Sequence, residues 1–335
     1  SLLKLDISDR LLMAENGISM MDFVYVPDVV ARHKFPIDDF FLYYPLAEGA
    51  WRAVPSQLDS IPHEFSKASY VIDGKNDIYW SAVDKAGIRN IYHSVYQDTI
   101  WSVPTLLNEH MTSASDEIYP MLSPDGKKMF FSSAGLYGVG GYDIYVSEWD
   151  EGTGDWSVPV NMGFPYSSPA DDFLYVNTED GRYSVFASNR DCSKDSVWVY
   201  VLAYDDMPVR RAVDDPDELR AIASLDPATM RSDNKETAVE TDIPENVDTR
   251  RYMLKMSEVR HLRDSIDRLG TEVEEARFDN DEEAVLDGEL ALIALRDSLD
   301  RASRILQEIE MEFLFSGVVI DPDKLLAEAD REIVS

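Results

Sequence analysis

The chain of 335 residues carries 64 acidic and 31 basic side chains, which gives a formal net charge of −33 and a pI near 4.3. A field of that sign repels phosphate groups, so it disfavours nucleic-acid binding and electrostatic binding to anionic lipid. The single cysteine, Cys192, excludes an intrachain disulfide framework and a metal site built from several thiolates.

The sequence contains no run of about 18 apolar residues, so we expect no transmembrane segment. It begins at Ser1 rather than at a methionine, and no basic segment followed by an apolar one opens it. We therefore expect that a signal or lipoprotein leader has been removed, with any lipid anchor outside this chain.

The segment Ser115–Trp156 has the clearest local pattern. Its short apolar and aromatic runs, Ile118–Leu122, Lys128–Ser132 and Tyr142–Ser147, alternate with turn residues, and a fourth run opens at Trp156. Pro and Gly in Ser123–Gly126 favour a tight turn because proline presets φ and glycine accepts positive φ. The pattern predicts a meander of four antiparallel strands, about 45 residues long, which is typical of one propeller blade.

The same unit recurs along residues 1–206. Trp101-Ser-Val-Pro104 and Trp156-Ser-Val-Pro159 match, and Trp51-Arg-Ala-Val-Pro55 matches with one inserted residue. An aromatic strand precedes each of these motifs, and a fourth such strand lacks the motif after it. These strands are Phe40–Tyr44, Asn90–His93, Tyr142–Tyr145 and Ser196–Tyr200. The spacing predicts a small β-propeller with four blades.

The last of these blades needs a partner strand from elsewhere in the chain. We predict that Leu2–Ile7 forms the outer strand beside Ser196–Leu202 and that the N-terminal strand thereby closes the ring. The fold class is then mainly β with α.

These residues resemble the TolB-type, WD-like β-propeller repeats that are common in envelope proteins of Gram-negative bacteria. The resemblance covers about residues 1–205 and is carried by Asp116–Ser133, Gly140–Tyr145 and Ser188–Arg190. The first two blades depart from the pattern, since Asp73–Asn76 keeps the Asp-Gly turn without Ser-Pro. The resemblance implies protein–protein interaction in the cell envelope.

The character of the sequence changes after the propeller. Residues 207–248 are acidic, contain four prolines and predict a linker with a short helix at Asp217–Ser224. Residues 249–316 show helical periodicity and predict an antiparallel, coiled-coil-like hairpin. Residues 317–335 form a tail in which Pro322 opens a short helix.

The predicted hairpin has apolar residues outside its internal seam. They would form a second apolar strip made of Leu286, Leu290, Ile293, Ile305, Met311, Leu314 and Phe315. An exposed apolar strip is typical of an interface, so we expect it to dock a partner protein. The alternative is that it packs on the propeller of the same chain.

Three aspartates recur near the entry of the predicted blades: Asp22, Asp116 and Asp172. Because their position repeats, they could line the central opening of the ring and bind a cation or ligand. We favour the alternative that each makes a repeated structural hydrogen bond. The histidines lack the spacing of a zinc site and there is no nucleophile motif. The sequence therefore predicts no catalytic residue, no metal and no cofactor.

We expect a non-enzymatic interaction scaffold or accessory subunit of an envelope complex, periplasmic or associated with the outer membrane, whose partners are other envelope proteins. The alternative is a carbohydrate-binding or glycoside-processing propeller with acidic residues at its central opening. A pair of carboxylates about 5–10 Å apart in an open pocket would favour that alternative.

Overall fold

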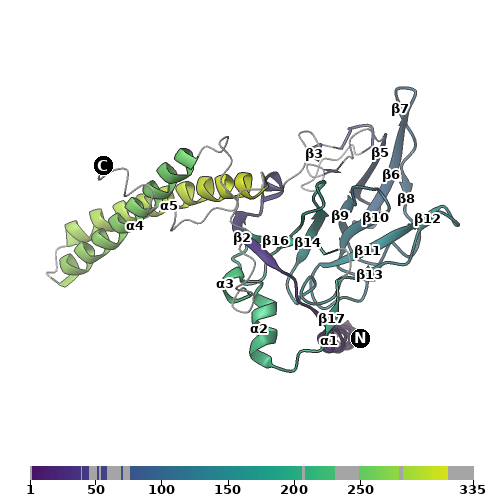
Figure 1. Ribbon diagram of the computed structural model, residues 1–335, viewed down its shortest axis with the longest axis horizontal. Helices are drawn as coiled ribbons and strands as arrows, with labels where there is room; N and C mark the ends of the chain where they lie inside the picture. The colour runs from purple at the N-terminus through teal and green to yellow at the C-terminus, as the bar shows by residue number, and fades with distance from the viewer. Residues whose placement is uncertain are drawn as a thin grey trace. The chain divides into compact units, whose positions relative to one another are not determined.

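The computed structural model of the protein separates into two compact units, Ser1–Glu236 and Thr237–Ser335. The structure describes residues 2–38, 40–44, 51–52, 54–58, 69–70, 76–205, 208–230, 249–278 and 282–315. The first unit is rich in antiparallel β-sheet and the second is a pair of helices (Figure 1).

The first sheet has the strand order β3-β4-β5-β6-β7, and β8 pairs with the far side of β6. Its strands are β3 (Trp51–Arg52), β4 (Ser69–Tyr70), β5 (Asp77–Val83), β6 (Arg89–Gln97), β7 (Ile100–Trp101) and β8 (Thr105–Leu106). The turn between β5 and β6 forms because the Asp84 carboxylate accepts hydrogen bonds from the backbone N–H groups of Ala86 (2.7 Å) and Ile88 (3.0 Å).

The second sheet has the order β12-β11-β10-β9, with β13 also pairing with β11. Its strands are β9 (Glu117–Leu122), β10 (Lys128–Ser133), β11 (Asp143–Asp150), β12 (Asp155–Trp156) and β13 (Val160–Asn161). Strands β9 to β12 are the four predicted from Ser115–Trp156, and β13 is an additional strand beyond that segment. The turn at Ser123–Gly126 forms as its residue types require, because Ser123 Oγ donates to Asp125 (2.5 Å) and Gly126 has φ 72°.

The third sheet has the order β14-β15-β16-β2, so a strand from near the N-terminus completes it. Its strands are β14 (Asp172–Asn177), β15 (Tyr183–Ser188), β16 (Ser196–Ala203) and β2 (Val29–Pro36). The register runs from Ser196 opposite Pro36 to Leu202 opposite Val29.

The prediction that Leu2–Ile7 forms the strand beside β16 is therefore wrong. Those residues begin helix α1 (Leu2–Met21), and β2 occupies the position beside β16. The segment before Asp22 lacks proline and is rich in leucine and methionine, which favour a helix, whereas β2 contains β-branched and aromatic residues.

The predicted aromatic strand Phe40–Tyr44 is also wrong. Phe40–Tyr43 forms the short 3₁₀ helix η1, in which Phe40 and Phe41 are buried. The Phe40 ring packs against Tyr119 of β9 and Phe173 of β14, and the Phe40 backbone does not pair with a strand. In the residues that the structure describes, three larger sheets and one two-stranded sheet are formed, and a closed ring of four blades is not.

A two-stranded sheet and two short helices add to the first unit. Strand β1 (Val24–Tyr25) pairs with β17 (Arg210–Arg211). Helices α2 (Pro216–Ser224) and α3 (Pro227–Met230) follow β17, and α2 is the short helix predicted at Asp217–Ser224. Residues 208–230 thus form folded structure within the first unit.

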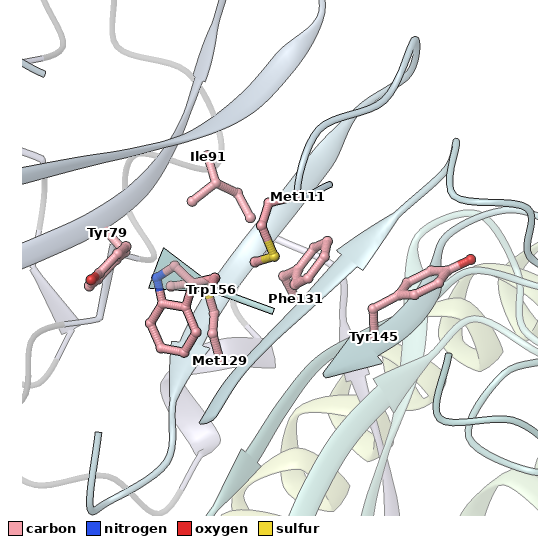
Figure 2. Close-up of a cluster of buried hydrophobic side chains, with 7 residues drawn as sticks. All are labelled: Tyr79, Ile91, Met111, Met129, Phe131, Tyr145 and Trp156. Atoms are coloured by element: carbon pink, nitrogen blue, oxygen red, sulfur yellow. The ribbon is translucent and has the colours of Figure 1, made fainter. Parts of the chain in front are cut away.

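The first and second sheets share a buried core. Figure 2 shows side chains from both sheets pointing into it. The cluster consists of Tyr79, Ile91, Met111, Met129, Phe131, Tyr145 and Trp156. Trp156 lies edge-on to Tyr79 with ring centroids 6.0 Å apart, so the repeated tryptophan joins neighbouring sheets.

The second unit is the predicted antiparallel helical pair, α4 (Thr249–Phe278) and α5 (Glu282–Phe315). Tyr252 near the start of α4 packs with Ile309 and Phe313 near the end of α5. The boundaries of the predicted linker and tail stay a prediction, and residues 317–335 lie outside the described residues. Among the described helices, none has the length and apolar character needed to cross a bilayer.

Candidate functional site

A pocket of about 410 Å³ opens between the first strands of the second and third sheets and the η1 turn. Its lining combines aromatic and aliphatic side chains with three polar ones, two aspartates and an asparagine. The lining residues are Ile37, Asp38, Phe40, Phe41, Ile118, Tyr119, Tyr142, Asp171, Phe173 and Asn189. Protein pockets that bind small molecules have this size and this mixture of apolar walls with a few polar groups.

Three rings form one wall of the pocket. Phe40 meets Phe173 edge-on, with centroids 5.4 Å apart and planes at 65°, and meets Tyr119 at 6.3 Å and 80°. Tyr119 stacks on Phe173 at 5.9 Å and 24°. The η1 turn therefore completes a wall that β9 and β14 begin.

Asp171 is the best-anchored polar group of the pocket. Its Oδ1 accepts a hydrogen bond from the Tyr142 backbone N–H (3.1 Å), and its Oδ2 accepts one from the Asn189 amide (2.6 Å). Asn189 Oδ1 in turn accepts from the Asp171 backbone N–H (2.9 Å). A Cβ on Gly141 would lie 2.0 Å from Asp171 Oδ1, so glycine is required for this close approach.

A second, more open hollow of about 310 Å³ adjoins the pocket, because Tyr142 and Asp171 line both. Asp116 lies there, paired with Arg89 (2.8 Å) and accepting a hydrogen bond from the Tyr142 hydroxyl (3.1 Å). Partial burial raises the pKa of Asp116, but hydrogen bonds from Arg89 and Tyr142 outweigh it and lower the pKa below its usual value. Burial, together with the negative charge of Asp116, raises the pKa of the Tyr142 hydroxyl.

The three aspartates singled out by their repeated position lie in different surroundings. Asp22 follows α1 and is exposed. Asp116 lines the second hollow, where its Oδ1 also accepts the Arg89 backbone N–H (2.8 Å). Asp172 is completely buried and forms an ion pair with Arg190.

The hydrogen bonds reveal the true equivalence between the repeats. Asp171 accepts the Tyr142 N–H at the start of β11, just as Asp116 accepts the Arg89 N–H at the start of β6. A structural hydrogen bond thus recurs, but Asp116 shares it with Asp171 rather than with Asp22 and Asp172. Asp171, rather than Asp172, is therefore the counterpart of Asp116.

The following residue in each repeat has a second structural role. Glu117 accepts hydrogen bonds from Ser113 (2.6 Å) and Ser133 (2.9 Å). Its counterpart Asp172 accepts one from Ser168 (2.6 Å). Complete burial raises the pKa of the Asp172 carboxyl, although Arg190 and the neighbouring hydroxyls act in the opposite direction.

Sequence reasoning missed Asp171, Asn189 and Asp38 as pocket residues. A signal for Asp171 was present, because Ser113-x-x-Asp116-Glu117 aligns with Ser168-x-x-Asp171-Asp172 once the serines are matched. No comparable signal marks Asp38, since its position depends on the η1 turn.

The predicted docking residues of α5 also separate into groups. Leu286, Leu290 and Ile293 are 60%, 58% and 56% exposed. Ile305 packs against the Tyr252 cluster, and Met311 is buried. Phe315 is partly buried, and the side chain of Leu314 lies outside the described residues.

In the ranges that the structure describes, no group of three or more metal-ligating side chains comes together. Comparisons with protein-family models and with curated proteins found no match to this chain.

Proposed function

We propose that the protein is a non-enzymatic interaction scaffold or accessory subunit of an envelope complex, periplasmic or associated with the outer membrane. In this proposal the β-rich unit is a TolB-type propeller and the helical pair docks another envelope protein. The envelope location rests on the sequence resemblance. The observation that carries the interaction role is the apolar strip formed by Leu286, Leu290 and Ile293 on α5.

The spacing of these residues places them on one face of the helix, since positions i, i+4 and i+7 lie above one another. Each side chain is more than half exposed. Burial of an aliphatic side chain contributes about 1.5–3 kcal/mol before the costs of association are subtracted. Three neighbouring aliphatic side chains therefore provide a compact anchor for a partner.

The charges around the strip indicate what kind of partner fits. Helix α5 contains nine acidic residues and three basic ones. Asp287 lies beside Leu286, and Asp297 lies one helical turn beyond Ile293. We infer that the partner presents an amphipathic helix whose apolar face is flanked by lysine or arginine.

Two neighbouring substitutions test this docking surface. Leu290→Glu places a charge in the strip, whereas Ala291→Glu adds the same charge at an exposed position about 100° around the helix. Affinity purification from the native envelope, followed by quantitative mass spectrometry, should show a partner retained by the Ala291→Glu protein and lost by the Leu290→Glu protein. Circular dichroism of both variants checks that the helices persist.

Two outcomes would contradict the proposal. Equal partner recovery with both variants would show that the strip is not the docking surface. Self-association that Leu290→Glu abolishes, measured by sedimentation equilibrium, would make the occupant a second copy of this chain.

One observation favours the carbohydrate alternative. Asp38 and Asp171 line the same aromatic-walled pocket, as two carboxylates of a glycoside-processing site would. Incubation with a panel of chromogenic glycosides tests it, since turnover lost in Asp171→Asn would support an enzyme. Absence of turnover and of sugar binding leaves the scaffold as the function that accounts for the exposed strip.

A further inference from the structure

We propose that the aromatic-walled pocket binds the lysine or arginine side chain of a partner polypeptide. The pocket belongs to the β-rich unit, so this inference goes beyond the docking strip on α5 and its test is independent of that strip.

The charge of the pocket selects a cation. Two carboxylates, Asp38 and Asp171, line it, and no lysine or arginine is present among the described residues that do so. Asp171 is held in place by two hydrogen bonds, and each of its oxygens keeps a lone pair for a further donor. An anionic ligand would meet uncompensated repulsion here, and the net charge of −33 attracts cations toward the surface.

The walls select an organic cation rather than a metal ion. Phe40, Tyr119 and Phe173 contact one another at centroid distances of 5.4–6.3 Å and line the same cavity. Aromatic faces attract ammonium and guanidinium groups by cation–π interaction, and the aliphatic stem of such a side chain packs on the rings. A hydrated metal ion would gain nothing from these walls.

The shape of the site indicates a side chain on a polypeptide rather than a free amine. A volume of about 410 Å³ accommodates one long side chain. The adjoining hollow of about 310 Å³ is lined by Ser115, Asp116, Ala134 and Gly141 together with the shared Tyr142 and Asp171. This second hollow offers polar contacts for the backbone on either side of the inserted residue.

Methyl NMR of the full chain provides a local readout, because Ile37 and Ile118 line the pocket. The probe is lysine blocked as Nα-acetyl-lysine-N-methylamide, and the matched control is the same compound made from norleucine, which lacks the ammonium group. We expect blocked lysine to shift the δ1 methyl signals of both isoleucines and to leave those of Ile222 and Ile309 unchanged. Blocked norleucine should bind at least several-fold more weakly.

Charge-removing variants and added salt test whether the pocket carboxylates contribute to the binding of blocked lysine. Asp38 is exposed at the rim, so Asp38→Asn should preserve the fold and weaken binding of blocked lysine by roughly threefold, the effect of losing one partly exposed ion pair. The control Glu151→Gln, in the exposed turn between β11 and β12 and outside the lining of both hollows, should leave the affinity unchanged. Higher salt should weaken binding further.

Three results would overturn the proposal. Equal binding of blocked norleucine would show that the pocket does not select a cation. Equal binding of cadaverine, a free diamine without a peptide backbone, would overturn the assignment to a polypeptide. The absence of any shift at Ile37 and Ile118 with blocked lysine or blocked arginine would show that the pocket does not bind these side chains.

Discussion

Replacing Asp172 by asparagine is expected to destabilise the first unit strongly, although the volume of the side chain hardly changes. The carboxylate is completely buried and pairs with Arg190, whose side chain is only 8% exposed. The substitution leaves the guanidinium buried without its counter-charge. Breaking one side of a buried ion pair costs about 3–5 kcal/mol, and we expect a loss in that range.

Arg190 makes further contacts, and these determine how much stability is lost when Arg190 itself is replaced. Its guanidinium donates to the backbone oxygens of Pro165 (2.9 Å) and Ala223 (3.2 Å), and its Nε donates to Ser188 Oγ (2.9 Å). Arg190→Met removes these bonds together with the charge. In the double variant with Asp172→Asn no unpaired charge is left, so the combined cost should fall short of the sum of the single costs by about 2 kcal/mol or more.

Urea unfolding followed by tryptophan fluorescence measures these costs in the full chain. All six tryptophans lie in residues 1–236, so the signal reports the first unit alone. Asp195→Asn, an exposed change of the same charge just before β16, serves as the control and should have little effect. A cost below about 1 kcal/mol for Asp172→Asn, or strictly additive single costs, would refute the view that Asp172 is a structural residue.

Two further predictions concern pH and helix packing. Burial raises the pKa of Asp143 from 3.8 to about 7, so ionisation of this carboxyl lowers stability as pH rises from about 4 through about 7. Asp143→Asn should therefore stabilise the first unit at pH 8 by roughly 2–4 kcal/mol and have little effect near pH 4; equal effects at both pH values in urea unfolding would contradict this. In the helical pair, Gly270→Ala should stabilise by up to about 1 kcal/mol because its site is open, whereas Gly288→Ala should destabilise because a Cβ would lie 2.4 Å from Val273. Hydrogen exchange of the α4 and α5 amides measures the stability of the helical pair in each variant. Equal changes in protection for Gly270→Ala and Gly288→Ala would contradict this packing difference.

The sequence was most informative where local chemistry determines local structure. The turn at Ser123–Gly126 and the repeated Trp156 located β9 to β12 of the second sheet, and Asn90–His93 with Trp101 located β6 and β7 of the first, because turn residues and large rings act over short distances. The helical pair followed from its apolar period in the same way.

Long-range contacts determined what the sequence did not show. Phe40 belongs to a strand-like aromatic run, yet it forms a turn because its ring packs on Phe173, far away in the sequence. β2 rather than Leu2–Ile7 completes the third sheet, and nothing local to β16 specifies which segment pairs with it.

The roles of Asp171 and Asp172 differ for a related reason. The two residues are adjacent and have the same chemistry, but Asp171 comes just before β14 and Asp172 opens it, and successive residues of extended backbone point to opposite faces. Asp171 consequently lines the pocket, whereas Asp172 is buried beside Arg190. Matching Asp116 with Asp172 instead of Asp171 is an error of one residue, and it assigns the pocket position to the buried aspartate.

Site-specific photo-crosslinking in intact cells tests whether α5 docks a partner through its exposed strip. A photoreactive p-benzoylphenylalanine replaces Leu290 in one strain and Ala291 in another, so that the two positions differ only in the face of the helix. We expect a discrete crosslinked species from position 290 and a much weaker one from position 291. Equal crosslinking at both positions, or none at position 290, would contradict it.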